Sequence, residues 1–295
     1  MAKILVLGAT GFLGRHLIKR LKDNQVTYLI RRNSKNTHIK GKNLTYGDVA
    51  NLDDLIKASK GQDIIINLST PNTQNDKINK KVIVDGAKNI ISAANKNKIK
   101  KIIHLSSAAI YRKNKDSYGE SKKEADELFL NSGLNTVILR PTMIYGRGGY
   151  AAEKLFASVI KIPFFVLVAG NGKNKIQPIY VNDAVSAIIS SINFEPNGVK
   201  SFALGGGYPI GYDEFVKKIL NAIHKKKTII HIPAILIIWL AKTLNIFFKN
   251  LAFNETTIKR MIEEIDIDNE KTLRELKIKI TDYDEALSDL FKKHK

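Results

Sequence analysis

Cysteine is absent from the 295 residues, which excludes disulfides and thiolate metal sites. The six histidines are scattered, and none stands in an HxxxH or HExxH pattern, so the sequence predicts no metal site. Prolines are few, and the 44% hydrophobic content is enough for a packed core. This composition and the length of the chain favour a folded protein of one large domain with a smaller lobe.

Acidic residues are scarce relative to basic ones, with 28 Asp and Glu against 48 Lys and Arg, and the formal charge is +20. Such a charge favours phosphate-rich ligands, nucleic acid or an anionic membrane surface as partners. The lysines are spread along the chain, however, and no cluster of basic and aromatic positions stands out. The sequence therefore predicts a solvated, Lys-rich surface and no nucleic-acid partner.

Long hydrophobic runs are also lacking. The N-terminus, MAKILVLGATGF, has only four apolar residues between Lys3 and Gly8, too few for a signal peptide, and predicts a cytoplasmic protein. The most apolar stretch lies within residues 233–253, where a helix over 234–248 would be only about 22 Å long. Two interpretations stay open: a helix packed in the lobe or against a second subunit of a homodimer, or one lying peripherally on the inner face of a membrane.

Strand-like and helix-like segments alternate over the first two thirds of the chain, the pattern of a parallel sheet with crossover helices. The expected strands are 3–7, 26–31, 44–46, 63–68, 101–106 and 136–140. The expected helices are 12–22, 52–59, 77–97, 117–130 and 181–192. The predicted fold is α/β, a Rossmann-type doubly wound parallel sheet over residues 1–140, to which 181–204 return, with a substrate lobe formed by 141–180 and 205–295.

A glycine-rich loop, GATGFLG, follows the first predicted strand directly and leads into an amphipathic helix. In a dinucleotide site such glycines permit a tight turn, a close approach of backbone to pyrophosphate and tight helix packing. The helix N-terminus adds N–H donors and positive potential. The sequence therefore predicts a dinucleotide cradle, whose candidate residues are Gly8, Thr10, Gly11, Phe12, Leu13 and Gly14.

Two arginines stand at the end of the second predicted strand, where a carboxylate is typical of NAD sites. Arg31 and Arg32 cannot accept hydrogen bonds from ribose hydroxyls, but they can bind a 2′-phosphate. NADP is therefore the favoured cofactor and NAD the alternative. After the third strand, Asp48 is a candidate acceptor for the adenine amino group, with Val49 beside it.

The spacing Tyr-x-x-x-Lys occurs three times, at Tyr111/Lys115, Tyr118/Lys122 and Tyr150/Lys154. Only Tyr118 and Lys122 open a strongly amphipathic helix, in which this spacing puts both groups on one face. A phenol has a reference pKa of about 10, and an ammonium one turn away lowers that pKa toward the working range of a general base. The preceding strand ends in Ser106 and Ser107, either of which can polarise a substrate oxygen.

In combination, these motifs resemble the extended short-chain dehydrogenase/reductase superfamily, in its nucleotide-sugar epimerase and dehydratase branch. The resemblance rests on the three spaced glycines, the strand end SSAAIY, the Tyr118/Lys122 helix and the tripeptide Leu139-Arg140-Pro141. It continues through QPIYVNDAV and FALGGG and covers nearly the whole chain. Near the C-terminus it is weak, because LKIKIT stands where the family often has Leu-Gly-aromatic-x-Pro.

The resemblance implies roles for individual residues. It selects Ser107 as the catalytic serine, because the family's serine lies four residues before a non-catalytic tyrosine, here Tyr111. It implies that Tyr118 is the general acid/base and that Lys122 lowers its pKa and holds the nicotinamide ribose. It also places Leu68, Ser69 and Pro141 beside the cofactor.

Two functions from different classes follow from this resemblance. The first is an NAD(P)-dependent oxidoreductase or epimerase acting on a nucleotide-diphosphate sugar. The second is a non-enzymatic nucleotide-binding subunit or assembly factor of a membrane complex, because IPFFVLVAGNGKNKIQPIYVNDAV also resembles the nucleotide-binding accessory subunit of respiratory complex I. The complete set of Ser107, Tyr118 and Lys122 favours the enzyme.

Overall fold

A computed structural model describes most of the chain. The described residues are 2–21, 25–32, 34, 39, 43–71, 73, 75–233, 236, 263–264 and 266–292, and the side chains of 150–154 and 161 are not among them. The chain divides into two compact units. The first contains residues 1–142, 181–204 and 268–279, and the second contains 143–180, 205–267 and 280–295.

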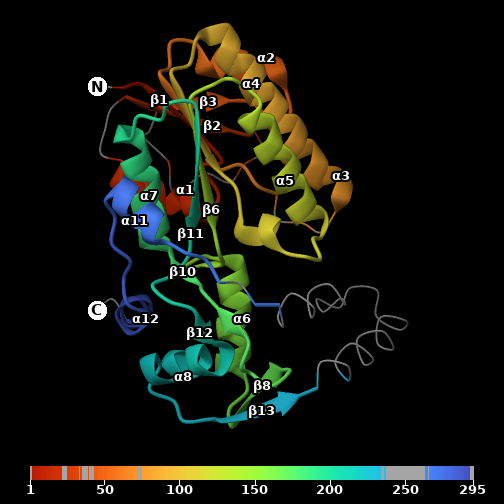
Figure 1. Ribbon diagram of the computed structural model, residues 1–295, viewed down its shortest axis with the longest axis vertical. Coiled ribbons are helices and arrows are strands. Elements are labelled where there is room, and N and C mark those ends of the chain that lie inside the picture. Colours follow the sequence, from red (N-terminus) through yellow and green to blue (C-terminus); the bar gives the residue numbers. More distant parts are fainter. Residues whose placement is uncertain are drawn as a thin grey trace. The chain divides into compact units, whose positions relative to one another are not determined.

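The first unit is built on a seven-stranded parallel sheet (Figure 1). The strands are β1 (Ile4–Leu7), β2 (Val26–Ile30), β3 (Asn43–Tyr46), β4 (Ile64–Asn67), β5 (Lys101–Leu105), β6 (Thr136–Pro141) and β11 (Val199–Leu204). Their order is β11-β6-β5-β4-β1-β2-β3, so the chain reverses direction across the sheet between β1 and β4. In open α/β sheets a ligand binds outside the carboxyl ends of the strands at such a reversal.

The strand register brings the predicted site residues to one edge of the sheet. Leu7 of β1 pairs with Asn67 of β4, and Asn67 pairs with His104 of β5. The strand cores are continuous apolar runs, as expected for strands buried on both faces. The loops after β1, β4 and β5 therefore all begin at the same level of the sheet.

Helices cover both faces of this sheet (Figure 1). On one face lie α1 (Phe12–Arg20), α7 (Val181–Asn193) and α11 (Glu270–Leu276), and on the other α2 (Leu52–Ser59), α4 (Gly86–Asn97) and α5 (Ser117–Leu130). The helix expected over 77–97 is interrupted: α3 (Asp76–Asn79) continues through a π-helical stretch, Lys80–Asp85, into α4.

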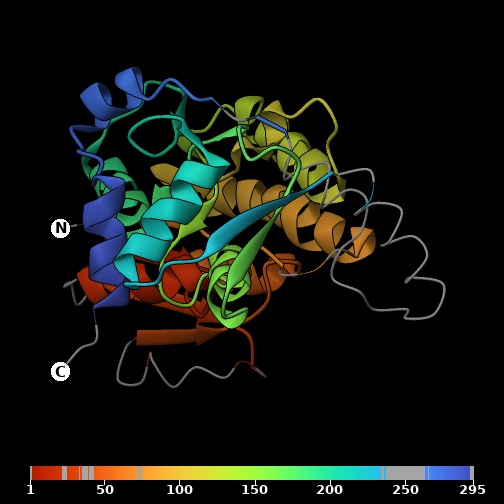
Figure 2. The ribbon, with the colours of Figure 1, turned by 90° about the horizontal axis from the view of Figure 1, so that it is seen from below.

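The second unit contains smaller elements. Its strands are β7 (Ile144–Tyr145), β8 (Phe165–Ala169), β9 (Lys175–Ile176), β10 (Ile179–Tyr180), β12 (Ile210–Gly211) and β13 (Thr228–Ile232). Its helices are α6 (Tyr150–Lys161), α8 (Tyr212–Ala222) and α12 (Tyr283–Phe291). The strands form three two-stranded sheets, of which the parallel pair of β8 and β13 is the longest (Figure 2).

The predicted Rossmann-type α/β fold is confirmed. Residues 268–279 differ from the expected boundaries, because they lie in the first unit, where the Thr272 hydroxyl donates to the carbonyl oxygen of Ala203 at 2.6 Å. Among the described residues, no helix is long and apolar enough to cross a membrane. The apolar stretch expected at 233–253 lies outside the described residues, except for Pro233 and Leu236.

Candidate active site

The cradle predicted after β1 is built by close backbone contacts. Gly8 has a φ of +78°, a conformation that favours glycine. A Cβ at Gly8 would lie 2.7 Å from the carbonyl carbon of Leu68 and 2.8 Å from the amide nitrogen of Ser69. The absence of a side chain at Gly8 therefore lets the loop after β1 touch the end of β4, which brings two predicted cofactor segments together.

The N-terminus of α1 follows this loop and carries the backbone N–H groups of the first helical turn. The helix begins after Gly11, which caps it without a side-chain hydrogen bond. A Cβ at Gly14 would lie 2.5 Å from the carbonyl oxygen of Ala9 and 2.6 Å from that of Gly8. Leu13 is buried, whereas Thr10 is half-buried and the ring of Phe12 packs edge-on against His16. The backbone thus forms a narrow cradle at a helix N-terminus, which fits a pyrophosphate.

The arginines and the carboxylate predicted for the adenosine end lie after β2 and β3. Arg31 and Arg32 follow β2 directly and are exposed. The Asp48 carboxylate accepts a hydrogen bond from the Ala50 amide at 2.9 Å and so closes a turn at the start of α2. Val49 is buried, and its side chain lies close to Gly86, the first residue of α4.

The remaining cofactor positions lie at the ends of β4 and β6. Leu68 is buried, and the amide of Ser69 donates to the Asn67 side chain at 3.0 Å. Pro141 is the last residue of β6 and is buried. All of these predicted positions therefore lie at the carboxyl edge of the sheet.

Ser107, Tyr118 and Lys122 come together at the end of β5 and the start of α5. Asp116 caps α5 by accepting from the Gly119 amide at 3.0 Å, which fixes where the helix begins. Ser107 caps a short 3-10 helix, Ala108–Tyr111, by accepting from the Ala109 amide at 3.1 Å, and it hydrogen-bonds Tyr118. The Lys122 ammonium lies 5.9 Å from the centre of the Tyr118 ring.

Burial dominates the acidity of Tyr118. It raises the pKa of the Tyr118 phenol above its ordinary value, while the hydrogen bond with Ser107 and the positive charge of Arg112 act in the opposite direction. The expected net lowering of the Tyr118 pKa is therefore wrong for the protein without its dinucleotide. The physical reason is that removing the phenolate from water costs more than these neighbours return.

Lys122 is held by two hydrogen bonds beneath the site. Its side chain is 1% exposed, and its ammonium donates to the carbonyl oxygen of Leu105 at 2.8 Å and to the Thr70 hydroxyl at 3.1 Å. Burial lowers the pKa of Lys122 to about 8, although the Asp126 carboxylate acts in the opposite direction. Lys122 is thus positively charged at neutral pH and close to losing its proton.

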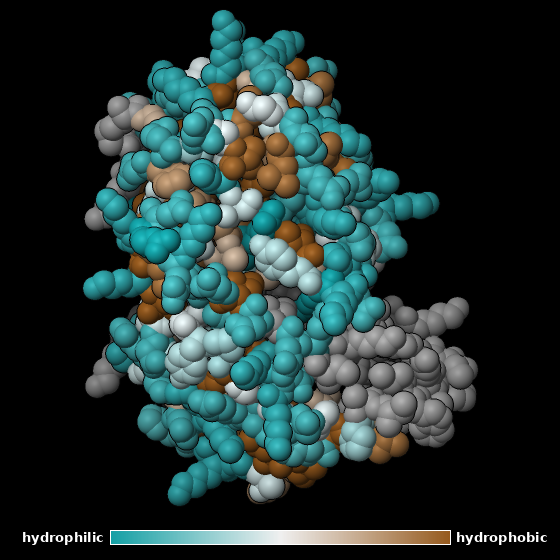
Figure 3. Space-filling view, in the orientation of Figure 1, coloured by the Kyte–Doolittle hydropathy of each residue, from teal (hydrophilic) through white to brown (hydrophobic). Residues whose placement is uncertain are grey.

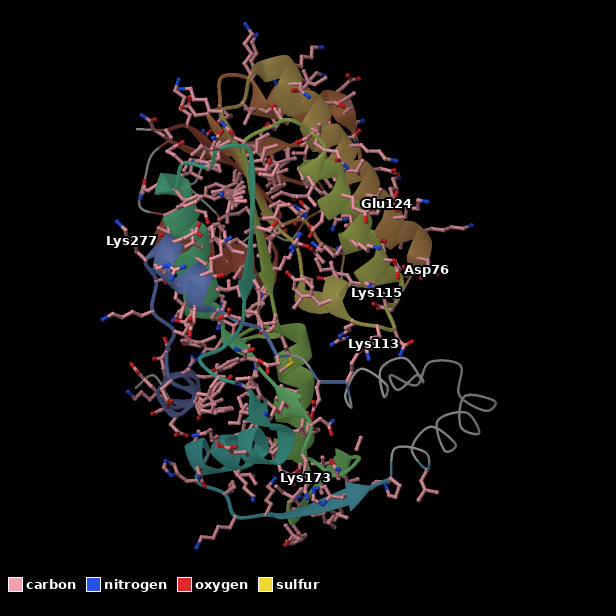
Figure 4. The ribbon with its side chains drawn as sticks, viewed as in Figure 1. Asp76, Lys113, Lys115, Glu124, Lys173 and Lys277 are labelled. Atoms are coloured by element: carbon pink, nitrogen blue, oxygen red, sulfur yellow. The ribbon has the colours of Figure 1, made fainter. Side chains whose placement is uncertain are left out.

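Tyr111 and Lys115 form no comparable pair. Tyr111 is exposed and its hydroxyl accepts from Arg140 at 3.1 Å, while Lys115, in the loop before α5 (Figure 4), donates to the carbonyl oxygen of Arg112 at 2.7 Å. Tyr150 and Lys154 lie at the start of α6, where their side chains are not described.

A buried polar chain, which the sequence did not predict, runs behind Lys122. Asn67 hydrogen-bonds His104 at 3.1 Å, His104 lies 3.7 Å from the Asp126 carboxylate, and Asp126 accepts from Arg140 at 2.8 Å. Burial raises the pKa of Asp126 and lowers that of His104 well below its usual range. The nearby positive charges of Lys122 and Arg140 act on His104 in the same direction as burial, so His104 is neutral.

Two residues that surround Lys122 could have been recognised from the sequence. Asp126 follows Lys122 by four residues, the spacing that places two side chains on one helical face. Thr70, which binds Lys122, follows the predicted cofactor position Ser69 directly. The other residues of the buried polar chain show no local sequence pattern, because it is the pairing of strands distant in the sequence that brings them together.

The profile of the NAD dependent epimerase/dehydratase family matches residues 4–205, which include the whole cradle and Ser107, Tyr118 and Lys122. The chain belongs to this family. Proteins similar to this chain include epimerases, dehydratases and sterol dehydrogenases. The chain is therefore an enzyme of the extended short-chain dehydrogenase/reductase type.

Individual family members resemble the chain over most of its length. A 3beta-hydroxysteroid-dehydrogenase/decarboxylase of Arabidopsis thaliana is 24% identical over 84% of this chain and 67% of that protein. The N-acetyl-alpha-D-glucosaminyl-diphospho-ditrans,octacis-undecaprenol 4-epimerase of Escherichia coli O157:H7 is 25% identical over 78% and 75%. The structure of UDP-glucuronic acid 4-epimerase from Bacillus cereus in complex with NAD shares the fold, with a TM-score of 0.73, 17% identity and coverage of 97% and 96%.

Proposed function

We propose that this protein is an NADP-dependent epimerase or oxidoreductase that acts on a sugar carried by a diphosphate, as in a nucleotide sugar. The observation that carries the proposal is the convergence of Ser107, Tyr118 and Lys122 at the sheet edge where Gly8 brings the ends of β1 and β4 into contact. The substrate class is supported by the diphospho-sugar epimerases among the relatives.

Each residue of the site has a separate task in this proposal. Tyr118 transfers a proton to or from a sugar oxygen, and Ser107 donates a hydrogen bond to the same oxygen. Lys122 supplies positive charge from a fixed position, because its two hydrogen bonds prevent it from turning toward solvent. The dinucleotide, when bound, accepts and returns the hydride, and its cationic nicotinamide adds the positive charge that a buried phenol needs to ionise.

The test of this function is a turnover assay with a panel of nucleotide sugars and each oxidised dinucleotide, with products separated by chromatography. Interconversion of a sugar at one carbon supports an epimerase, and net accumulation of reduced dinucleotide supports a dehydrogenase. A 3β-hydroxysteroid belongs in the same panel, because one relative is named for that substrate. If the protein holds a dinucleotide tightly but converts none of the sugar nucleotides, the proposed substrate class is wrong.

The cofactor preference gives a separate prediction. We expect the double variant Arg31→Ala/Arg32→Ala to bind NADPH about a hundredfold more weakly, because it removes the two exposed guanidinium groups that would bind the 2′-phosphate. Binding of NADH, which lacks that phosphate, should change less than threefold. Fluorescence titration of the reduced dinucleotides measures both values. A wild-type protein that binds NADH more tightly than NADPH contradicts the preference and leaves the rest of the proposal intact.

The low pKa of Lys122 predicts a pH dependence of catalysis. Below a pH of about 8 the ammonium is present and supports proton transfer by Tyr118, and above it the positive charge is lost. We expect kcat/KM, which reports on the free enzyme, to fall as the pH rises through about 8. Lys122→Arg keeps the charge at every accessible pH, so its profile should lack this descending limb even if its maximum is lower. An unchanged limb in that variant contradicts the assignment.

A further inference from the structure

An exposed apolar face is formed by the two parallel strands of the second unit, β8 and β13 (Figures 1 and 2). Alternation along the strands points Val166 and Val168 to the buried side. The opposite side carries Leu167 and Ile230, which are cross-strand partners and are 44% and 42% exposed.

This face is unusual for a surface that meets only water. Single exposed apolar side chains are common, but here two are paired in register on neighbouring strands. Hydrophobic atoms are visible in the space-filling view where Figure 1 labels β8 and β13 (Figure 3). The burial of these side chains against a partner would therefore be favourable.

Lysines lie at both ends of the face among the described residues. Lys225 and Lys226 precede β13 and are exposed, and Lys173 follows β8 and is exposed (Figure 4). Residues 159–182 and 215–254 contain no Asp or Glu. Two described carboxylates lie close to the strands: that of Asp213 on α8 is bound to His231 at 2.7 Å, and that of Glu264 accepts from the Lys175 amide at 3.4 Å. The apolar face thus has a rim in which lysines outnumber the described carboxylates.

We infer that this face, made by Leu167 and Ile230 with the rim of Lys173, Lys225 and Lys226, docks onto the surface of an anionic phospholipid bilayer. Apolar side chains enter the boundary between headgroups and acyl chains, and lysines at the same level bind lipid phosphates. A protein partner fits less well, because protein interfaces are enriched in Tyr, Trp and Arg and need about one hydrogen bond per 100–200 Å². The side chains of Leu167 and Ile230 offer none of these hydrogen bonds.

The test is sedimentation of the full chain with vesicles of phosphatidylcholine alone or mixed with phosphatidylglycerol. We expect at least tenfold stronger partitioning onto the anionic vesicles, weakened by high salt. Leu167→Ser/Ile230→Ser should reduce partitioning at least tenfold at any salt concentration. Lys225→Gln/Lys226→Gln should reduce it about thirtyfold at low salt only. Leu130→Ser, which changes a similarly exposed leucine on α5, is the matched control and should bind as wild type.

The absence of cysteine allows a second readout that does not depend on affinity. Ile230→Cys provides a single labelling site for a polarity-sensitive fluorophore, and its emission should shift to the blue with anionic vesicles, whereas Leu130→Cys should not shift. Two results overturn the inference. One is the absence of vesicle binding by the wild-type protein. The other is conversion of a wild-type dimer to a monomer by Leu167→Ser/Ile230→Ser, which would assign the face to a second copy of the chain.

Discussion

Tyr118→Phe is expected to lower turnover by about a thousandfold and to leave dinucleotide binding unchanged. The substitution removes one oxygen, which hydrogen-bonds Ser107 and transfers the proton, and keeps the ring that faces the Lys122 ammonium. Rate measurements at saturating substrate give the first quantity, and titration with NADPH gives the second. A loss of both would mean that the variant has disturbed the site as a whole.

Tyr111→Phe is the matched control for this experiment. Tyr111 has the same spacing to a lysine, but it is exposed and its hydroxyl binds Arg140. We expect this variant to retain turnover within about threefold, since only a partly exposed hydrogen bond is lost. If Tyr111→Phe is inactive and Tyr118→Phe is active, the choice among the three tyrosine–lysine pairs is wrong.

Gly14→Ala is expected to lower the free energy of unfolding by about 3 kcal/mol and to weaken dinucleotide binding at least tenfold. The added methyl group would lie 2.5 Å and 2.6 Å from two backbone carbonyl oxygens, which cannot move without opening the cradle. Chemical denaturation measures the stability, and NADPH titration at a temperature where the variant is folded measures binding.

Gly207→Ala tests whether the effect comes from crowding rather than from the loss of a glycine. At Gly207 the nearest atom to the added methyl group would be the Ile280 side chain at 3.9 Å, an ordinary contact distance. The free energy of unfolding should change by less than about 0.5 kcal/mol. Equal destabilisation by both substitutions would contradict the close packing described for the cradle.

The sequence predicted the sheet and the positions of the site because both have local signals. The apolar strands and the glycine loop are contiguous patterns, and the helix that contains Tyr118 and Lys122 begins and ends at the predicted residues, Ser117 and Leu130. The selection of this pair over Tyr111 and Lys115 depended on helical amphipathicity, which the burial of Ala125 and Phe129 reflects.

Features set by tertiary contacts could not be predicted in the same way. The π-helical stretch between α3 and α4 lies where buried Asn79 hydrogen-bonds Ser117 of α5 at 3.3 Å, and a wide helical turn leaves little trace in apolar periodicity. The raised pKa of Tyr118 depends on how deeply the ring is buried, which the spacing to Lys122 does not reveal. The polar chain through His104 and Asp126 likewise depends on strand register.

The central claim is that Tyr118 exchanges a proton with a diphosphate-linked sugar while the dinucleotide takes up a hydride. Its most direct test is to mix the protein, loaded with oxidised dinucleotide, with each nucleotide sugar and to follow the near-ultraviolet absorbance of reduced nicotinamide in a stopped-flow instrument. The account predicts that one or more sugars produce this absorbance within a single turnover in the wild-type protein and not in Tyr118→Phe. Equal reduction in both proteins, or reduction by none of the sugars, would contradict it.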